Sequence, residues 1–278
     1  MIKSRQKIIS NILKTLVKTS VIITVLVVVF IVGYILIKGL PHLKSGLFSM
    51  KYNSENVSLF PAFINTIITI LISLLISVPL GIGSAIYLVE YAKKENVFVK
   101  VIRLTTETLS GIPSIIYGLF GLLFFVTYAK MGMSLLSGSF TLSIMILPLI
   151  MRTTEEALIS VPLLYREGSF GLGAGKLRTI IKIVLPSAIP GILSGIILAI
   201  GRIVGESAAL IYTAGTVPQI PVNLLGSGRT LSVHMYVLAN EGLYTNQAFG
   251  TGVVLLITVL IINLISTFIA KKVTKGKA

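Results

Sequence analysis

Long apolar runs alternate with short polar and basic segments along the whole chain. A bilayer core about 30 Å thick takes roughly 20 apolar residues per helix, and five runs reach that length. These runs are residues 16–39, 62–89, 112–130, 187–212 and 249–270. A sixth run, 140–151 (FTLSIMILPLIM), is short and is followed by the polar stretch RTTEE. The pattern predicts an all-α membrane protein with five clear transmembrane helices and a weaker sixth.

The distribution of Lys and Arg residues between the two sides of the membrane distinguishes five spans from six. With six spans, both termini share one side of the membrane with the loops 90–111 and 152–186, and that side carries 18 of the 24 Lys and Arg residues. Five spans would leave the basic tail KKVTKGK on the opposite side. Because cytoplasmic loops collect Lys and Arg, we predict six transmembrane helices with both termini in the cytoplasm.

Composition supports a membrane protein without a separate soluble domain. Hydrophobic residues make up 54% of the 278 and charged residues only 12%, with a mean hydropathy of +0.97. The predicted division is a cytoplasmic segment 1–15, a transmembrane domain 16–270 and a basic cytoplasmic tail 271–278. The first helix lacks an evident cleavage site, so we expect it to be retained. Cytoplasmic loops account for the net charge of +15 without nucleic acid.

Reactive side chains are scarce. The chain has no Cys and no Asp, and its two histidines, His42 and His234, lie outside the apolar runs and far apart in the sequence. We therefore predict no catalytic residue, no metal site and no bound cofactor, and we interpret both histidines as ordinary loop residues. A membrane-embedded enzyme would need a cluster of reactive groups that this composition does not supply.

A glycine-rich basic segment, REGSFGLGAGKLRTIIKIVLP at residues 166–186, interrupts the apolar pattern. The pattern predicts a helix over 153–170 that is bent near Pro162 and extends beyond the membrane. A reversal follows at the glycines, and then an amphipathic helix, with Pro186 at the start of the next span. The glycines that permit a positive φ are Gly171, Gly173 and Gly175. From the residues alone, an exposed hairpin and a packed connecting loop are equally compatible with the pattern.

Nucleotide binding by this segment is excluded by its spacing. A phosphate-binding P-loop needs G-x-x-x-x-G-K-[ST]. Here Phe170 stands at the position of the first glycine and Leu177 at that of the hydroxyl residue. We therefore predict that this chain does not hydrolyse ATP.

The same segment resembles the EAA loop of ATP-binding-cassette (ABC) importer permeases, E-A-A-x3-G-x9-I-x-L-P. Its spacing is met in full, with Gly and Ser in place of the two alanines. The matching residues are Glu167, Gly168, Ser169, Gly173, Ile183, Leu185 and Pro186. The resemblance implies a type I ABC importer permease fold and a coupling helix, within about 153–186, that docks on a separate ATPase subunit. ATP and Mg²⁺ then belong to that partner.

Three further stretches resemble one group of these permeases in particular. SGIPSIIYGLFGL at 110–122 and RTTEEALISVP at 152–162 are similar to phosphate-importer permeases, and GRIVGESAALIYTAG at 201–215 resembles the PstA type. The resemblance implies a multi-pass plasma-membrane protein of a bacterium or archaeon that imports phosphate. Its implied partners are a pair of ATP-binding subunits, a second, PstC-like permease subunit in a heterodimer, and an extracytoplasmic phosphate-binding protein.

Two charges, Arg202 and Glu206, fall inside the predicted fifth span. Charged groups at mid-bilayer are costly, at about 2.5–3.5 kcal/mol on insertion scales, and face protein or water. Four residues apart on one helical face, the two can pair, either as a structural ion pair or as part of a translocation path in which the arginine fork contacts phosphate. Ser114, at the start of the third span, is a further pathway candidate. Four glycines in the fifth span, Gly191, Gly195, Gly201 and Gly205, suit close helix packing.

Two alternatives stay open at this stage. Sulfate and molybdate permeases share the EAA loop, so another oxyanion fits the same loop. An ion-coupled secondary carrier would show inverted repeats and broken helices, and the hydropathy pattern shows no two-fold symmetry.

Overall fold

The computed structural model describes residues 2–93 and 96–275, and every regular element in that part of the chain is helical. The α-helices are α1 (Ile2–Gly39), α2 (Phe60–Ile86), α3 (Val97–Ser110), α4 (Ser114–Gly121), α5 (Leu135–Ile159), α6 (Leu163–Gly171), α7 (Lys176–Thr179), α8 (Leu185–Gly205), α9 (Ala208–Thr213), α10 (Leu231–Glu241) and α11 (Thr245–Lys275). Short 3-10 turns occupy Leu40–His42 and Ser45–Phe48, and π-helical turns occupy Tyr87–Tyr91, Leu122–Tyr128 and Ile180–Val184.

Five helical segments of the described residues are long and apolar enough to cross a membrane. They are Ser10–His42, Phe60–Tyr91, Leu135–Ile159, Lys176–Gly205 and Thr245–Phe268. A sixth crossing is obtained when α3 and the segment Ser114–Tyr128, bent by 102° relative to each other, count as one span. The six-helix prediction is confirmed in this form.

The third span differs from its prediction as the single run 112–130. The chain forms two helices because Pro113 has no N–H and disfavours helical backbone at Ile112, so α3 ends at Ser110 and α4 starts at Ser114 with Pro113 as its N-cap. The segment 90–111, expected to be a loop, thus contains the helix α3, which packs along α5.

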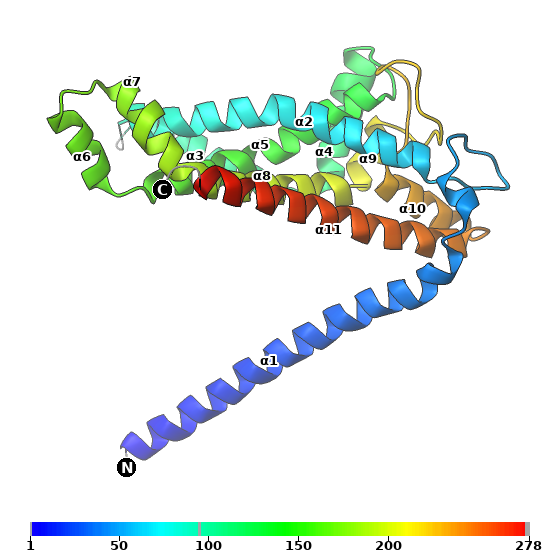
Figure 1. Cartoon of the computed structure of the whole chain (residues 1–278), viewed down its shortest axis with the longest axis horizontal. Helices are drawn as coiled ribbons and strands as arrows, with labels where there is room; N and C mark the ends of the chain where they lie inside the picture. The colour runs from blue at the N-terminus through cyan, green and yellow to red at the C-terminus, as the bar shows by residue number, and fades with distance from the viewer. Residues whose placement is uncertain (1, 94–95, 276–278) are drawn as a thin grey trace.

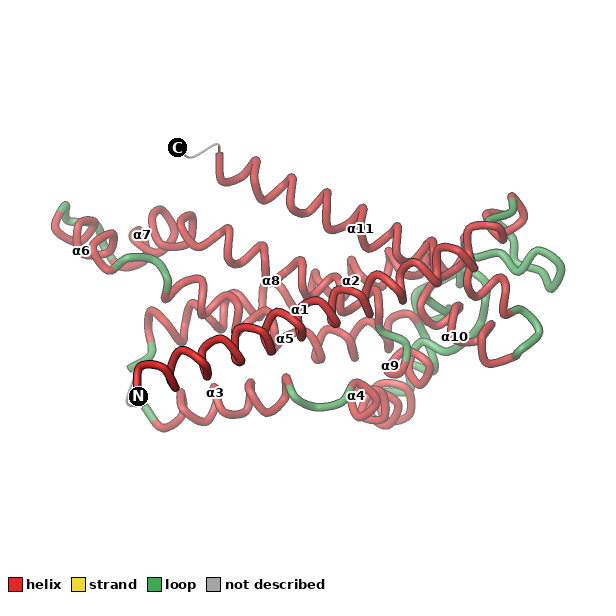
Figure 2. Tube along the Cα trace, turned by 90° about the horizontal axis from the view of Figure 1, so that it is seen from below, coloured by secondary structure: helices red, strands yellow, loops and turns green. Residues whose placement is uncertain are grey.

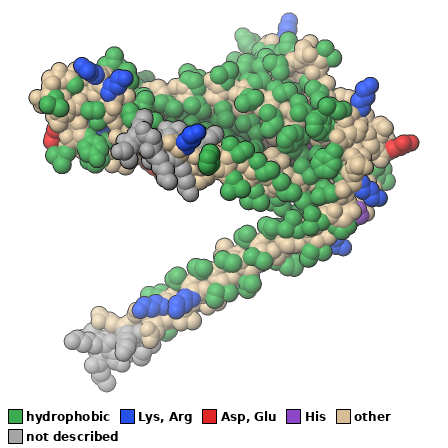
Figure 3. Space-filling view, in the orientation of Figure 1, with side chains coloured by type: hydrophobic (Ala, Val, Ile, Leu, Met, Phe, Trp, Pro, Cys, Tyr) green, Lys and Arg blue, Asp and Glu red, His purple; other side chains and the backbone are tan. Residues whose placement is uncertain are grey.

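The long helices lie side by side in a bundle. Figures 1 and 2 show α2, α5, α8 and α11 running alongside one another, while α6 and α7 project from one end. The start of α1 and the end of α11 lie toward that same end, and α10 lies at the opposite end. Charged side chains gather near the two ends of the bundle and apolar side chains cover its middle (Figure 3). This distribution is that of a membrane-spanning bundle.

The weak sixth run of the sequence becomes the centre of the bundle. Helix α5 extends over 25 residues and packs against both α2 and α8. Several of its serines and threonines are buried and donate hydrogen bonds to carbonyl oxygens one turn earlier in the helix, as Ser139 does to Leu135 over 2.7 Å. Ser73 of α2 also donates to the Ser139 carbonyl oxygen over 3.1 Å. Polar side chains satisfied in this way can be buried between membrane helices.

Helix α1 leaves the bundle at an angle (Figure 1). It is one continuous helix from Ile2, so no structural boundary separates residues 1–15 from the span that follows. It meets α11 only near its C-terminal end, where Tyr34 packs edge-on against Phe249 with ring centroids 5.8 Å apart. A Cβ at Gly39 would collide with the Phe249 backbone, so glycine permits this approach.

The fifth span is longer at one end and shorter at the other than predicted. Helix α7, the π-helical turn and α8 form one run, Lys176–Gly205. Pro186 stands in the first turn of α8, as predicted, but the run begins ten residues before it. The wider π turn directly before Pro186 accommodates a ring that would otherwise clash with the preceding turn. The run ends at Gly205, well before residue 212.

The connection 213–248 contains α10. His234, expected to be a loop residue, is fully buried in that helix. The interpretation was wrong for His234 because Tyr52 and Val57 of the segment 43–59 lie beside its ring, and they are far from it in the sequence. His42 lies in a 3-10 turn, as expected for a loop residue.

Candidate functional site

The glycine-rich segment forms a helical hairpin, defined here as residues 163–179. Helix α5 ends at Ile159, Pro162 caps α6, and the chain reverses at Gly173, whose φ is +81°. This conformation is open to glycine without strain. The predicted bend near Pro162 and the glycine reversal are both present, so the segment is a projecting hairpin rather than a packed loop.

The two arms of the hairpin are joined by a pair of hydroxyls. Ser169 of α6 and Thr179 of α7 lie with their side-chain oxygens 2.8 Å apart, and both are buried. An alanine at position 169 could not make this bond. The replacement of the second alanine of the EAA pattern by serine therefore adds a link that holds the hairpin closed.

The outer surface of the hairpin is apolar and exposed. Leu172 at the tip is 91% exposed, and Leu164 and Leu177 are more than 60% exposed. Glu167, Gly168 and Gly173 are also on the surface. Exposed apolar clusters on a projecting segment mark sites of contact with other proteins or with lipid.

A groove of about 750 Å³ runs along the base of the hairpin. It is lined by Tyr165, Ile181, Lys182, Ile183, Pro186, Ser187 and Pro190. Of the predicted docking residues, Ile183 and Pro186 line this groove, while Leu185 is half-buried beside it. The predicted residues therefore divide between the hairpin surface and the groove at its base.

An ion pair that sequence reasoning missed ties the hairpin to α2. Arg166 donates from Nη2 and Nε to Oε1 of Glu90, over 2.8 and 3.1 Å, and both side chains are largely buried. The same guanidinium donates to the carbonyl oxygens of Val161 and Leu158, over 2.8 and 2.9 Å. The signal that could have found the pair is its place: Arg166 directly precedes Glu167, and Glu90 ends the second span.

A second contact strengthens this tie. The Lys176 ammonium lies over the Tyr91 ring, 4.8 Å from its centroid. Both arms of the hairpin therefore contact the π-helical turn Tyr87–Tyr91 at the end of α2. Movement of the hairpin would be transmitted to α2 through side chains as well as through its covalent connections to α5 and α8.

The predicted pairing of Arg202 with Glu206 is not found, and the reason is a helix break. Helix α8 ends at Gly205, and Glu206 has an extended backbone with ψ of 126°. Its carboxylate accepts a hydrogen bond from the Ala209 N–H, over 3.1 Å, at the start of α9. The Glu206 carboxylate therefore caps α9, and Arg202 and Glu206 no longer share a helical face. None of the ion pairs among the described residues includes Arg202.

Ser114 lies half-buried at the first position of α4, directly after its N-cap Pro113. The structure brings α4 against α9, where a Cβ at Gly118 would meet Ala209. No hydrogen bond joins Ser114 to Arg202 or Glu206 in the described part of the chain. Of the three pathway candidates, Arg202 and Glu206 lie close in sequence at the end of α8, and Ser114 belongs to α4, which packs against α9 and α5.

The four glycines of α8 divide into two pairs. Gly191 and Gly195 pack closely on α5, where an added Cβ would meet Ala157 and Thr153. Gly201 and Gly205 face open space within this chain. Close helix packing is thus present for the first pair.

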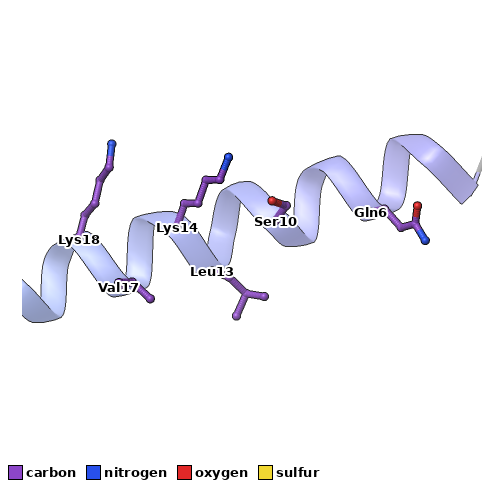
Figure 4. A pocket seen from close by; sticks show the side chains of 6 residues that line it. All are labelled: Gln6, Ser10, Leu13, Lys14, Val17 and Lys18. Atoms are coloured by element: carbon purple, nitrogen blue, oxygen red, sulfur yellow. The ribbon is translucent and has the colours of Figure 1, made fainter. Parts of the chain in front are cut away.

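One surface depression lies away from the hairpin, along the first turns of α1. Figure 4 shows Lys14 and Lys18 on one side of this helix and Leu13 and Val17 on the other. All the residues that line it belong to α1, so nothing encloses a ligand there. Metal-binding groups of three or more His, Asp or Glu residues are absent from the described ranges.

Comparisons with known proteins agree with this architecture. Residues 77–277 match the family described as binding-protein-dependent transport system inner membrane component. The probable ABC transporter permease protein YqgI of Bacillus subtilis is 35% identical over 87% of this chain and 89% of its own length. The phosphate transport system permease protein PstA of Mycobacterium leprae is 33% identical, covering 74% of this chain and 68% of its own.

A solved structure shows the same fold. One chain of a bacterial alginate ABC transporter, in complex with an alginate pentasaccharide-bound periplasmic protein, matches with a TM-score of 0.63 and 17% identity. The match covers 93% of this chain and 96% of that one. The chain therefore belongs to the family of binding-protein-dependent transport system inner membrane components. Within that family it is an ABC importer permease of the PstA type.

Proposed function

We propose that this chain is one of two permease subunits of an ATP-driven phosphate importer, and that its hairpin docks on an ATPase subunit. The observation that carries the docking is the hairpin surface. It projects from one end of the bundle (Figure 1), and Leu172 at its tip is 91% exposed. On the cytoplasmic side, such a surface is stabilised by contact with another protein.

Phosphate as the substrate rests on the PstA-type relatives and on the oxyanion chemistry of Arg202. The alginate transporter shares the fold, so the fold alone does not select a substrate. Sulfate and molybdate are the alternatives that the arginine would also accommodate, because a guanidinium fork suits any tetrahedral oxyanion.

In the proposed assembly, the partner subunits bind and hydrolyse ATP. A pair of ATP-binding subunits holds ATP and Mg²⁺, a PstC-like subunit completes the permease, and an extracytoplasmic phosphate-binding protein delivers the anion. ATP binding closes the pair of ATP-binding subunits, and the docked hairpin moves with them. The Arg166–Glu90 contact passes that movement to α2. Alternating access then follows from the movement of α2 and α8 about α5.

The substrate is tested by purifying the complete transporter in lipid nanodiscs and measuring its ATPase activity with loaded binding protein. We expect phosphate-loaded binding protein to stimulate hydrolysis, and the sulfate- and molybdate-loaded forms to leave it at the basal rate. Stimulation by one of the other anions instead would overturn phosphate as the substrate.

The docking is tested by Leu172→Ser, with Leu243→Ser as the matched control. Leu243 is 83% exposed at the opposite end of the bundle. Burial of one leucine is worth about 1.5–3 kcal/mol, or roughly tenfold to hundredfold in affinity, so the ATPase should co-purify poorly with Leu172→Ser. Equal recovery of the ATPase with both variants would contradict docking at the tip.

The pathway role is tested by Arg202→Gln in the assembled transporter. We expect phosphate uptake to fall while the ATPase subunits still co-purify, because Arg202 lies in α8, away from the hairpin. Undiminished uptake with normal assembly would remove Arg202 from the pathway.

A further inference from the structure

A second polar cluster lies at the end of the bundle opposite the hairpin. Arg229, Thr230 and His234 are 3%, 2% and 0% exposed. Thr230 is the N-cap of α10 and His234 lies in its first turns. Arg229 and Thr230 end the segment that connects α9 to α10, and Tyr52, from the segment that connects α1 to α2, packs against both Arg229 and His234. The proposed docking and pathway do not use this region.

The polar atoms of this cluster are largely without partners. Nε and Nη2 of Arg229 and Oγ1 of Thr230 are buried and make no hydrogen bond. Neither ring nitrogen of His234 makes a hydrogen bond of good geometry, although the Val57 carbonyl oxygen lies beside the ring. A buried guanidinium without a counter-charge is strongly unfavourable, and none of the ion pairs among the described residues involves Arg229.

Tyr52 brings the cation and the histidine together. The Arg229 guanidinium carbon lies 4.9 Å from the centroid of the Tyr52 ring, and the same ring meets His234 edge-on with centroids 6.2 Å apart. Burial, with a smaller contribution from the Arg229 charge, lowers the pKa of His234 to about 3. The imidazole is therefore neutral near pH 7, so that it offers one N–H and adds no second positive charge.

The backbone around the cluster is held firmly. Asn65 of α2 donates from Nδ2 to the carbonyl oxygens of Arg229 and Gln219, each over 3.2 Å. The Leu231 N–H donates to Thr66 Oγ1 over 2.9 Å. These bonds fix the start of α10, whose N-terminal backbone contributes a partial positive charge. The Thr230 hydroxyl does not cap the helix and stays available for a ligand.

We propose that Arg229, Thr230 and His234 form a binding site for a small inorganic oxyanion at the outer end of the bundle. The guanidinium and the hydroxyl donate, and this donor set suits an anion, while the single N–H of the neutral imidazole faces the Val57 carbonyl oxygen. Water could satisfy their hydrogen bonds but would leave the guanidinium charge without a counter-charge. The choice of phosphate as the anion rests on the proposed function; the existence of the site does not.

This site extends the path beyond Arg202. An anion released at the outer end would meet Arg229 first, because Arg202 lies within the membrane-spanning α8. Tyr52 covers the guanidinium in this structure, so access to the site requires the segment between α1 and α2 to move. The outer cluster then holds the anion while the path toward α8 is closed.

The test uses the full chain in lipid nanodiscs with ring-¹⁵N-labelled histidine and His42→Gln, which leaves His234 as its one histidine. Inorganic phosphate is titrated while the His234 ring signals are followed by NMR. We expect a saturable change. In Arg229→Gln we expect binding to weaken by about tenfold to hundredfold, the range for losing charge-assisted hydrogen bonds. Lys130→Gln, which removes an exposed charge elsewhere, is the matched control and should titrate like the parent.

Each outcome decides the proposal. No saturable change in the folded parent, or an equal titration in Arg229→Gln, would mean water or an adventitious ion only. If Arg229→Gln does not fold, Arg229→Lys takes its place, and an unchanged affinity there overturns the proposal, because lysine lacks the planar fork. A saturable response to sulfate with none to phosphate supports the site and instead overturns phosphate as the transported anion.

Discussion

Helices α1 and α5 are opposites in sequence and in surroundings. The most apolar window of α1 has a mean hydropathy of 3.0 and none of it is buried within the chain. The corresponding window of α5 has a mean hydropathy of 1.6 and 67% of it is buried. The helix with the strongest membrane signal is thus peripheral, and the helix with a weak signal is central.

The difference follows from what each helix contacts. A helix surrounded by lipid has to be apolar on every side, because no partner satisfies a polar group there. A helix surrounded by other helices can carry serine and threonine, as Ser139 and Ser143 show by donating to carbonyl oxygens of their own helix. Hydropathy therefore reports exposure to lipid, and low hydropathy in a membrane span indicates burial in protein.

The largest effect expected from this contrast is a cavity in α5. Leu142→Ala removes a fully buried side chain and should cost about 2–5 kcal/mol of unfolding free energy. Leu26→Ala in α1, where the leucine is 61% exposed, should change it by no more than about 0.5 kcal/mol. Unfolding in mixed micelles of mild detergent and SDS measures both. Equal losses would show that α1 is as well packed as α5.

The next comparison sets a buried ion pair against an exposed one. Glu90→Gln leaves the Arg166 guanidinium without its counter-charge, at a cost of about 1.5–3 kcal/mol. Glu156→Gln breaks the exposed pair with Arg152 and should cost no more than about 0.5 kcal/mol. Limited proteolysis of the hairpin provides the second measurement: cleavage near Gly173 should increase for Glu90→Gln only. A hairpin equally protected in both variants would argue against the tie.

The buried His234 and the turn residue His42 should differ in how much each contributes to the pH dependence of stability. The folded pKa of His234, about 3, lies below its ordinary value of 6.5, so protonation favours the unfolded state and stability falls as the pH drops below 6.5. At about 1.4 kcal/mol per pH unit, the loss between pH 6.5 and pH 5 is about 2 kcal/mol. His234→Gln should remove this dependence and His42→Gln should keep it. An unchanged pH profile in His234→Gln would show that another group is responsible.

The smallest effect is expected at the glycines of α8. A Cβ at Gly201 meets nothing, so Gly201→Ala should stabilise the helix by about 0.5–1 kcal/mol. The same change at Gly195 brings a methyl group against Thr153 and should destabilise the protein. Thermal unfolding of the two variants separates the cases. Destabilisation by Gly201→Ala would indicate that another surface packs on this glycine.

Local signals in the sequence predicted the hairpin well. Pro162 and Gly173 impose their backbone preferences wherever they stand, so the bend and the reversal follow from single residues. The same is true of Pro113 at the start of α4. Long apolar runs likewise identified the spans, because an unpaired backbone is excluded from lipid in any fold.

The helix break after Gly205 was not predictable from the pattern. The residues 201–212 suit a continuous helix in a hydropathy plot, and the spacing of Arg202 and Glu206 suits an ion pair. The break depends on α9 turning to pack against α4, which places the Ala209 N–H near the Glu206 carboxylate. The burial of Arg229 and His234 similarly depends on segments far apart in the chain.

The sequence by itself determined that this chain is a helical membrane protein, the orientation that its charges favour, and the place of its hairpin. The tertiary structure decided which helix is central, which acid pairs with Arg166, where α8 ends and which histidine is buried. The physical reason is that turns and transfer to lipid depend on a residue and its near neighbours. Burial and charge pairing depend instead on contacts between helices. Because lipid and a protein interior both accept apolar side chains, an apolar run does not tell which of the two surrounds it.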